Sequence, residues 1–371
     1  MASDLPPEHR ALVLESIEDD FQLKTIPTPQ PGLGSAIVQV ISVGVLSYAH
    51  KIYNGERRYS FPKPLVGGFS AVGRIAALGP DAAVLKVGQL VWVDCVVRGR
   101  DDPSTLFLSA IHEGFSEGSR KLMRDVWRDG TFAEFAKVPL ENCIALNEVR
   151  LCQGLGYSHR DLAYLSYLLV PYGGLRDIKL EPGETIVVCP ATGGFGGAAV
   201  QVAVAMGARV VAMGRNEKEL ARLKEHVRIG TPGANIELVK MSGDEATDTA
   251  ALQAFGIIDA VLDFSPPEAA NSTHLKSAID SLRRGGRCSL MGSGKYTIDN
   301  WKVMGDNITL KGKLMYERKD MLQFVKMLEM GLFPKGKEFV DVKAFELGHW
   351  KEAFNVAAEY MGIGKVVVIE P

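Results

Sequence analysis

Apolar stretches and polar turns alternate along this chain in two different ways. Up to about Glu148 the pattern predicts mostly β-structure, with strand candidates at residues 11–15, 35–43, 65–78, 89–97 and 130–135. Gly67, Gly68 and Gly73 in the third candidate predict bent or bulged strands. Residues 98–128 break the pattern with mixed charges, glycines and aromatic side chains, which predicts a long loop with short helices or a lid over a site.

From about Thr185 onward, strand-like runs alternate with helix-like segments. Strands are expected near residues 185–189, 209–213, 237–241, 257–264, 286–292 and 308–315, and helices over 198–206, 217–228, 246–255 and 272–284. This order predicts an α/β fold whose doubly wound parallel sheet is covered on both faces. A largely apolar helix over 158–174 precedes it. A helix near 350–361 and a strand at 365–369 predict that the tail returns to the first part.

Composition narrows the class of protein. A length of 371 residues favours two domains. The formal net charge is −2 and both signs are spread along the chain, so neither a nucleic-acid surface nor a polybasic membrane patch is predicted. No apolar run reaches membrane-spanning length, and the segment 1–10 carries proline and charge instead of an apolar signal core. We expect a cytoplasmic protein.

The five cysteines are odd in number and form no close pair along the sequence. This argues against a disulfide framework and is typical of a reducing compartment. We interpret all five as small buried hydrophobic side chains; they are Cys95, Cys143, Cys152, Cys189 and Cys288.

A glycine cluster follows the first strand of the second part. The β-branched run at 187–188 leads into Thr192-Gly193-Gly194-Phe195-Gly196-Gly197, and an apolar helix candidate follows at once. Glycines allow positive φ and let a backbone approach a ligand closely. The start of the helix offers N–H groups and a positive dipole end, which suit the pyrophosphate of a dinucleotide. The segment 192–196 therefore predicts coenzyme binding and a nicotinamide-dependent enzyme.

The end of the next strand bears on the choice of coenzyme. An NAD site commonly has a carboxylate there, whereas this chain has Gly214-Arg215-Asn216, with Lys218 shortly after. A guanidinium binds a 2′-phosphate through charge-assisted hydrogen bonds. We therefore expect NADPH/NADP+ in preference to NAD, with Arg215, Asn216 and Lys218 at the site. Alternatively, Arg215 and Lys218 are ordinary solvated charges at a helix start.

Further pocket residues follow from position in the fold. Ligands of open α/β sheets bind outside the carboxyl ends of the strands, where Phe264, Ser265, Gly292 and Ser293 are expected to flank the coenzyme. Other residues are candidates for the nicotinamide end or for an aromatic wall of the substrate pocket. They are Lys295, Tyr296, Trp127 and Phe132.

With these motifs, the chain resembles the medium-chain dehydrogenase/reductase superfamily. The resemblance covers nearly the whole chain and includes Gly44-Val45, the strands around 67–68 and 88–93, the glycine cluster with Gln201 after it, and the ending 364–368. It implies a GroES-like, mostly β barrel domain at 1–165, completed by 335–371. It also implies a Rossmann dinucleotide-binding domain at 166–334.

The chain departs from the zinc-dependent members of that superfamily. They carry a catalytic cysteine where this chain has Leu46, and Gly-His-Glu where it has Gly67-Gly68-Phe69. The four closely spaced cysteines of their structural zinc have no counterpart in 98–128. Zinc requires imidazole, thiolate or carboxylate donors. The resemblance therefore points to a protein without zinc, in the zinc-independent branch of quinone oxidoreductases and enoyl reductases.

Hydride transfer without a metal needs another group to donate a proton or stabilise an oxyanion. The cluster Ser47-Tyr48-Ala49-His50-Lys51-Ile52-Tyr53 lies where zinc-dependent relatives keep a cysteine and a hydroxyl relay. By this resemblance Tyr48 is the candidate catalytic proton donor, and His50 could pass protons to solvent. Alternatively, Tyr48 is only a wall of the pocket and His50 a surface residue. Tyr53 is a weaker candidate in the same pocket.

We therefore expect an NADPH-dependent, zinc-independent reductase of an enone, quinone or ketone, with its small-molecule substrate in a cleft between the domains. The resemblance also implies edge-to-edge pairing through the strand at 308–315, so we expect a homodimer. Two alternatives stay open. One is a metal-free alcohol dehydrogenase that oxidises a secondary alcohol, and the other is a protein that binds NADPH without turning anything over.

Overall fold

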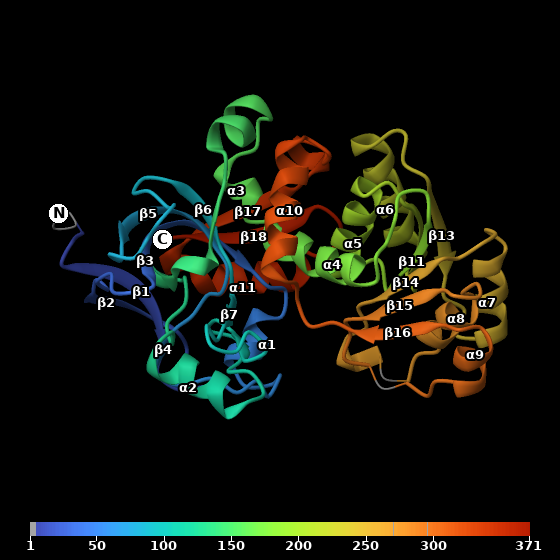
Figure 1. Ribbon diagram of the computed structural model, residues 1–371, viewed down its shortest axis with the longest axis horizontal. Coiled ribbons are helices and arrows are strands. Elements are labelled where there is room, and N and C mark those ends of the chain that lie inside the picture. Colours follow the sequence, from blue (N-terminus) through green and yellow to red (C-terminus); the bar gives the residue numbers. More distant parts are fainter. Residues whose placement is uncertain (1–4, 270, 295) are drawn as a thin grey trace. The chain divides into compact units, whose positions relative to one another are not determined.

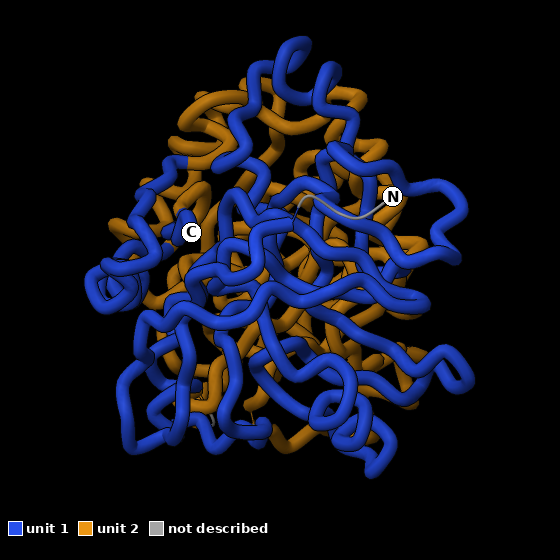
Figure 2. The backbone as a smooth tube through the Cα atoms, turned by 90° about the vertical axis from the view of Figure 1, so that its left-hand side faces the viewer, with its two compact units in different colours: residues 1–166, 341–361, 366–371 blue, residues 167–340, 362–365 orange. Residues whose placement is uncertain are grey.

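The computed structural model describes residues 5–269, 271–294 and 296–371. The chain folds into two compact units, drawn in blue and orange in Figure 2. Unit 1 holds residues 1–166, 341–361 and 366–371, and unit 2 holds 167–340 and 362–365. The expected domains placed all of 335–371 with the first, whereas 335–340 and 362–365 group with unit 2. Within the described residues, no helix combines the length and apolarity needed to cross a membrane.

Unit 1 is built mainly from short strands (Figure 1). They are β1 (Glu8–Leu14), β2 (Gln22–Pro27), β3 (Ser35–Val45), β4 (Leu65–Val66), β5 (Ala71–Leu78), β6 (Leu90–Val93), β7 (Val96–Arg98), β8 (Leu106–Leu108), β9 (Phe135–Pro139), β10 (Cys143–Ala145), β17 (Asp341–Glu346) and β18 (Lys365–Glu370). Its helices are α1 (Ala49–Tyr53), α2 (Glu117–Asp125), α3 (His159–Leu162) and α11 (Trp350–Glu359), and α4 (Leu165–Asp177) runs from unit 1 into unit 2.

The strand β3 organises the main sheet of unit 1. One edge of β3 pairs with β5, and the other pairs with β9 and, further along, with β18. Register shifts between Ile37 and Val38 and between Val40 and Ser42 bend the pairing with β5. The pairing of β18 with β3 confirms that the tail returns to the first part.

The prediction of a strand at 130–135 is wrong in its position. The strand in this part of the chain is β9, which begins only at Phe135. Residues 130–132 instead fold back against the glycine pair that follows β4. The Gly130 N–H donates to Val66 O, and the Phe132 N–H donates to Gly67 O. These hydrogen bonds satisfy the backbone without a regular ladder.

Aromatic rings fill the core of unit 1. The ring of Phe21 makes edge contacts with Tyr53, Phe132, Trp350 and Phe354 at centroid distances of 4.8–6.2 Å. Two of these partners come from α11, so the returning tail supplies part of the core as well as a strand. Edge-to-face packing of this kind adds to the gain from burying apolar area.

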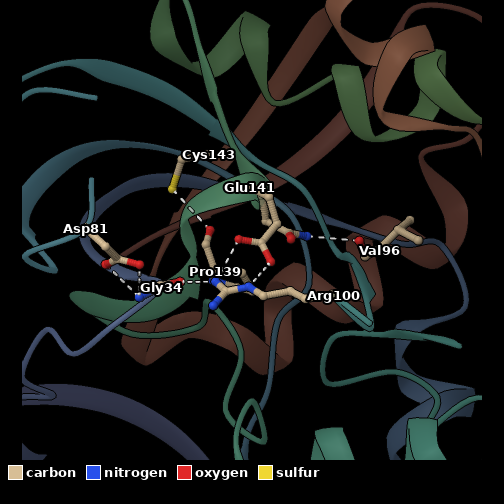
Figure 3. A network of polar contacts seen from close by, with 8 residues as sticks. Gly34, Asp81, Val96, Arg100, Pro139, Glu141 and Cys143 are labelled. Atoms are coloured by element: carbon tan, nitrogen blue, oxygen red, sulfur yellow. Dashed lines mark hydrogen bonds and ion pairs between the residues drawn. The ribbon is translucent and has the colours of Figure 1, made fainter. Parts of the chain in front are cut away.

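A polar network ties the loops of unit 1 together (Figure 3). The Arg100 guanidinium donates to both carboxylate oxygens of Glu141, at 2.8 and 2.9 Å, and to Gly34 O at 2.7 Å. The Gly34 N–H in turn donates to Asp81. Gly34 has φ +69°, a conformation that favours glycine, and a Cβ there would displace the Arg100 guanidinium, which would lie 2.0 Å from it. The network fixes the start of the segment 98–128, which contains β8 and α2.

The cysteines match the expectation in part. All five are free thiols, and four of them are buried. Cys152 is partly exposed because it lies in a helical turn at 149–154, so the expectation of a buried side chain is wrong for this residue.

Unit 2 alternates strands and helices as predicted (Figure 1). Its elements are β11 (Thr185–Cys189), α5 (Gly194–Ala205), β12 (Arg209–Gly214), α6 (Glu217–Gly230), β13 (Ile236–Lys240), α7 (Glu245–Gln253), β14 (Ala260–Asp263), α8 (His274–Asp280), β15 (Arg287–Leu290), α9 (Asn300–Gly305), β16 (Thr309–Gly312) and α10 (Arg318–Glu329). The helix α10 is absent from the prediction, and the helix expected over 158–174 is interrupted at Ala163 and Tyr164 between α3 and α4.

The sheet of unit 2 is parallel, with strand order β13-β12-β11-β14-β15-β16. The order reverses at β11, which is the switch point where doubly wound folds bind their ligands. All five residues of β11 are buried, as expected for a strand covered on both faces. The helices α7 and α8 contribute Leu252, Leu275 and Ile279 to the core on one face, and α5 and α6 lie on the other (Figure 1). On α6, the predicted apolar face of Leu220, Leu223 and Val227 is confirmed.

Candidate functional site

The glycine cluster connects β11 to α5 at the switch point of the sheet. The helix begins at Gly194, with Gly193 as its N-cap in extended geometry and with no capping side chain. By contrast, Asn216 and Asp244 cap the neighbouring helices α6 and α7 with their side-chain oxygens. The first N–H groups of α5 are thus not satisfied by a capping side chain and are suited to an anion.

Close approach explains two of these glycines. A Cβ at Gly196 would lie 2.0 Å from Pro190 O, and one at Gly197 would lie 2.5 Å from Ile363 N. Gly193 differs, because no atom lies within 4 Å of where its Cβ would be. The expectation of positive φ in this turn is wrong, since none of the four glycines lies in the left-handed region. The backbone is ordinary, and it is the packing of α5 onto β11 that excludes side chains.

The residues expected at the coenzyme's ribose lie at the end of β12. Thr192 and Gly214 are neighbours, because a Cβ at Gly214 would meet Thr192 Cγ2 at 3.2 Å. The turn after β12 therefore lies beside the glycine cluster. Arg215 and Lys218 are exposed there, and no described carboxylate makes an ion pair with either. The Asn216 side chain is already engaged, because its Oδ1 accepts from the Lys218 N–H at 3.0 Å.

Aromatic rings border the glycine cluster. The Phe195 ring stacks on Phe264 at 6.0 Å between centroids with an interplanar angle of 19°, and it contacts Tyr167 at 4.9 Å. The first turn of α5 and the end of β14 are thus joined through two residues that the sequence predicted to bind coenzyme.

Four side chains at and after the end of β14 form a chain of hydrogen bonds, which we call the buried polar chain. Its members are Asp263, Ser265, His274 and Ser272, and of these only Ser265 was predicted from the sequence. The Ser265 hydroxyl donates to Asp263 Oδ1 and contacts His274 Nε2 at 2.7 Å, while the Ser272 hydroxyl contacts His274 Nδ1 at 2.5 Å. Because Ser265 gives its proton to the carboxylate, His274 Nε2 donates to Ser265 and Nδ1 accepts from Ser272. Asp263 and His274 are buried. A carboxylate at the end of an apolar strand was the signal that such partners exist.

The buried polar chain fixes the loops that were expected to flank the coenzyme. The Ser293 N–H donates to Ser265 O at 2.8 Å. Gly292 has no room for a side chain, because its Cβ would lie 2.5 Å from both Asp263 Oδ2 and the Ser265 nitrogen. Ser265, Gly292 and Ser293 therefore lie together at the carboxyl end of the sheet.

Tyr296 was expected in the substrate pocket, and the structure buries its hydroxyl. Its ring meets the His274 ring edge-on at 6.2 Å, and burial raises the pKa of Tyr296 to about 12. Tyr296 therefore packs beside the polar chain as a neutral phenol. Lys295, the other candidate here, lies outside the described residues.

One group of possible metal ligands occurs in residues 5–269, 271–294 and 296–371, formed by Cys189, Asp263 and His274 with ligand atoms within 4.8 Å. To bind zinc here, Cys189 would have to be a thiolate and His274 would need a free ring nitrogen. Here burial raises the pKa of Cys189 well above its usual value, which keeps the thiol protonated, and both His274 nitrogens have hydroxyl partners. We therefore interpret these three residues as a hydrogen-bonded cluster in the core of unit 2 and not as a metal site.

In unit 1, the candidate proton donor lies at the start of α1. Tyr48 is the N-cap residue of this helix and is half-buried, and the Arg57 guanidinium lies 3.8 Å above its ring centroid. His50 is exposed on the same helix. Tyr53, at the other end of α1, is 5% exposed, and its hydroxyl accepts from the Gly68 N–H at 3.0 Å. Its ring packs in the aromatic core, and its expected place in the substrate pocket stays a prediction.

The positions that hold zinc ligands in zinc-dependent relatives offer none here. Leu46 and Phe69 are buried apolar side chains. Gly68 has φ +89°, and a Cβ there would lie 2.4 Å from Phe132 N and 2.8 Å from Thr131 Oγ1. A histidine at this position would need a different backbone. The residues present do not fit a zinc ion at this place.

The two residues expected to form an aromatic wall differ in environment. Phe132 is 1% exposed and packs against Phe21 and Phe354 in the core, and its expected role in the wall of a substrate pocket stays a prediction. Trp127 is half-buried just beyond α2, and its backbone N–H donates to Leu122 O.

Comparison with known proteins identifies the class to which this fold and site belong, a two-domain dehydrogenase. The family model "Alcohol dehydrogenase GroES-like domain" matches residues 32–148, and "Zinc-binding dehydrogenase" matches 194–330. Alcohol dehydrogenase 1 of Caenorhabditis elegans is 24% identical, with 92% of this chain and 93% of the relative covered.

Solved structures share the whole fold. The cobalt- and zinc-bound thermostable alcohol dehydrogenase of Pyrobaculum aerophilum superposes with a TM-score of 0.71 at 23% identity, covering 98% of this chain and 100% of the other. A crotonyl-CoA carboxylase/reductase superposes with a TM-score of 0.78 at 16% identity, covering 99% and 89%. The chain belongs to the medium-chain dehydrogenase/reductase superfamily of oxidoreductases, with a GroES-like domain and a Rossmann domain that binds pyridine nucleotides.

The buried polar chain generates a prediction for stability. Replacing His274 with leucine leaves Ser265 and Ser272 without their buried partner, so the free energy of unfolding should fall by about 1–3 kcal/mol. Urea unfolding followed by circular dichroism measures the change. His349→Leu, at an exposed position, is the control and should shift stability by less than about 0.5 kcal/mol. Equal unfolding midpoints for the two variants would contradict this interpretation.

Proposed function

We propose that this protein is a zinc-independent, NADPH-dependent reductase that acts on enones, quinones or ketones. The observation that carries the proposal is the backbone at Gly68, where Phe132 and Thr131 occupy the space that a ligand side chain would need. Without a metal to polarise the substrate oxygen, a hydrogen-bond donor from the chain must take that role.

The coenzyme-binding half of the proposal rests on unit 2. The uncapped start of α5 and the open space above Gly193 suit a pyrophosphate, and Phe195 and Phe264 supply apolar surface beside it. Exposed Arg215 and Lys218 suit a 2′-phosphate at the adjacent turn. When bound, the reduced coenzyme supplies the hydride. The polar chain from Ser272 to Asp263 holds the loop at 264–265 in place.

Tyr48 is proposed to supply the proton. Its phenol is half-buried at the start of α1, and the guanidinium of Arg57 lies 3.8 Å from its ring centroid. His50 is exposed on the same helix and can exchange protons with solvent. In reduction, a substrate carbon would take the hydride, and Tyr48 would donate its proton to the carbonyl oxygen or, in an enone, to the carbon next to the carbonyl.

The oxidative direction is the second candidate, because alcohol dehydrogenases are prominent among the relatives of this chain. The same residues would then accept a proton from a secondary alcohol. Steady-state rates in both directions distinguish the two candidates. Coenzyme binding without turnover of any substrate would instead support the non-catalytic alternative.

The test of the function is a substrate panel. We expect turnover of NADPH with enones, quinones or ketones, and a fall in kcat of about 10²–10⁴-fold in Tyr48→Phe, because the variant lacks the proton donor. NADPH binding, measured by calorimetry, should be unchanged in this variant. Full turnover by Tyr48→Phe would remove the proton-donor assignment, and turnover by none of the panel would overturn the proposed activity.

Coenzyme preference has a separate test. Arg215→Ala should weaken NADPH binding about tenfold or more while leaving NADH binding unchanged, because only NADPH carries the phosphate that Arg215 is proposed to bind. Arg222→Ala is the matched control, since Arg222 is exposed on the same helix, α6, and pairs with Glu219. An equal effect of Arg215→Ala on both coenzymes would contradict the proposed preference.

We further propose a homodimer formed through β16. In the described part of unit 2, β16 pairs only with β15 and its other edge is unpaired. On the preceding helix α9, Trp301 is 77% exposed and Met304 59%. Light scattering should give the mass of a dimer, and Trp301→Asp should shift it towards the monomer, while Leu33→Asp, at an equally exposed position of unit 1, should not. A monomer in the wild type would contradict this proposal.

A further inference from the structure

The side chain of Arg57 is held beside the proposed proton donor. Its guanidinium carbon lies 3.8 Å from the centroid of the Tyr48 ring, and its Nη1 donates to the Tyr59 hydroxyl at 3.4 Å. The Arg57 backbone N–H donates to Lys51 O at 2.8 Å, which joins this residue to α1. A cation over an aromatic face is attracted by the ring quadrupole. The charge of Arg57 therefore has a defined place next to Tyr48.

One edge of this guanidinium has no partner in the chain. Among residues 5–269, 271–294 and 296–371, no carboxylate pairs with Arg57, and its Nε and Nη2 take part in no hydrogen bond. Arg57 is half-buried, and neither of these two nitrogens is enclosed. Together they form the side of the guanidinium fork that binds both oxygens of a carboxylate.

The carboxylates of the neighbouring segments are engaged elsewhere. Glu56 accepts from the Asn54 side chain at 2.8 Å. Glu113, which contacts Ser60, is bound by the Arg124 guanidinium at 2.9 and 3.0 Å. The segment 51–63 contains four basic residues, and Glu56 is its one acidic residue. The charge on Arg57 is therefore left for an anion that comes from outside the chain.

A ligand that meets both Arg57 and Tyr48 must carry its carbonyl close to its carboxylate. The guanidinium covers the face of the Tyr48 ring, and the hydroxyl lies on the rim of that same ring. A carboxylate on the edge of Arg57 thus leaves room for only a short link to a carbonyl oxygen that accepts from Tyr48. We propose that Arg57 selects the substrate, and that the preferred substrates are 2-oxo acids, whose carbonyl and carboxylate are on adjacent carbons.

This inference rests on the proposed function, because the role of Tyr48 comes from there. The two oxygens of the carboxylate accept from Nε and Nη2 of Arg57, which orients the adjacent carbonyl. The carbonyl carbon takes the hydride of the reduced coenzyme, and the carbonyl oxygen takes the Tyr48 proton. The product is a 2-hydroxy acid, the coenzyme leaves oxidised, and the phenolate regains its proton from solvent.

Three ketones of five carbons test the selection with the full-length protein and NADPH. They are 2-oxopentanoate, its isomer 4-oxopentanoate and pentan-2-one, which has no carboxylate. We expect kcat/KM for 2-oxopentanoate to exceed that for each of the others about tenfold or more, which corresponds to one charge-assisted hydrogen-bonded pair. The isomer should gain little, because its carbonyl and carboxylate are separated by two methylene groups.

Variants assign this preference to Arg57. Arg57→Gln should bring the three values of kcat/KM close together, mainly through a higher KM for 2-oxopentanoate. Arg57→Lys should restore the preference in part, because lysine keeps the charge but not the fork. The matched control is Arg58→Gln, at the neighbouring exposed arginine, and it should keep the preference of the wild type. Thermal unfolding checks that each variant is folded.

Oxamate gives a readout that is independent of turnover, because it has the same adjacent carbonyl and carboxylate but is not reduced. In calorimetry with the NADPH-loaded protein, Arg57→Gln should weaken oxamate binding about tenfold and Arg58→Gln should not. This result without reduction of any ketone would support the carboxylate site, and only the proposed function would fall. Similar reduction of all three ketones by the wild type and Arg57→Gln would overturn the selection and leave the proposed function standing, and a wild type that binds no oxamate would also overturn it.

Discussion

The close approach of α5 to the end of β11 is the constraint on which the nucleotide-binding unit depends. At Gly196 the helix backbone lies against Pro190 O, and at Gly197 against the segment that begins at 362. Both contacts exclude a β-carbon, and together they hold the start of α5 beside the end of the central strand. The open space above Gly193 and the uncapped N-terminus of the helix follow from this placement. The proposed phosphate site is therefore a consequence of packing.

The same constraint shows where sequence reasoning succeeded and where it did not. The order of strands and helices in unit 2 was predictable because buried parallel strands are nearly continuous apolar runs, and helices such as α6 show one apolar face. The role of the glycines was predicted only in part, since close approach is correct and positive φ is not. The sequence alone does not show whether a glycine is needed for close approach or for positive φ, because both require the absence of a side chain.

The candidate site was harder to predict than the fold. Tyr48 and Tyr53 are five positions apart in the sequence, yet α1 begins after the first and ends at the second, so one ring is half-exposed and the other lies in the core. The start of such a short helix has no reliable sequence signal. His274 was missed because its partners are two hydroxyls and a carboxylate whose burial is set by tertiary packing. Polar residues in loops give no periodicity from which such a chain could be read.

The pairing of β18 with β3 has a consequence for synthesis of the chain. Residues 43–45 of β3 receive their partner, residues 367–369, only from the far end of the sequence. A nascent chain on the ribosome therefore exposes this edge, and the aromatic core that α11 completes, while residues 167–340 of the Rossmann unit are already available to fold. The barrel is the later unit to mature, and during that interval its unpaired edge is open to capture by a chaperone or by another nascent chain.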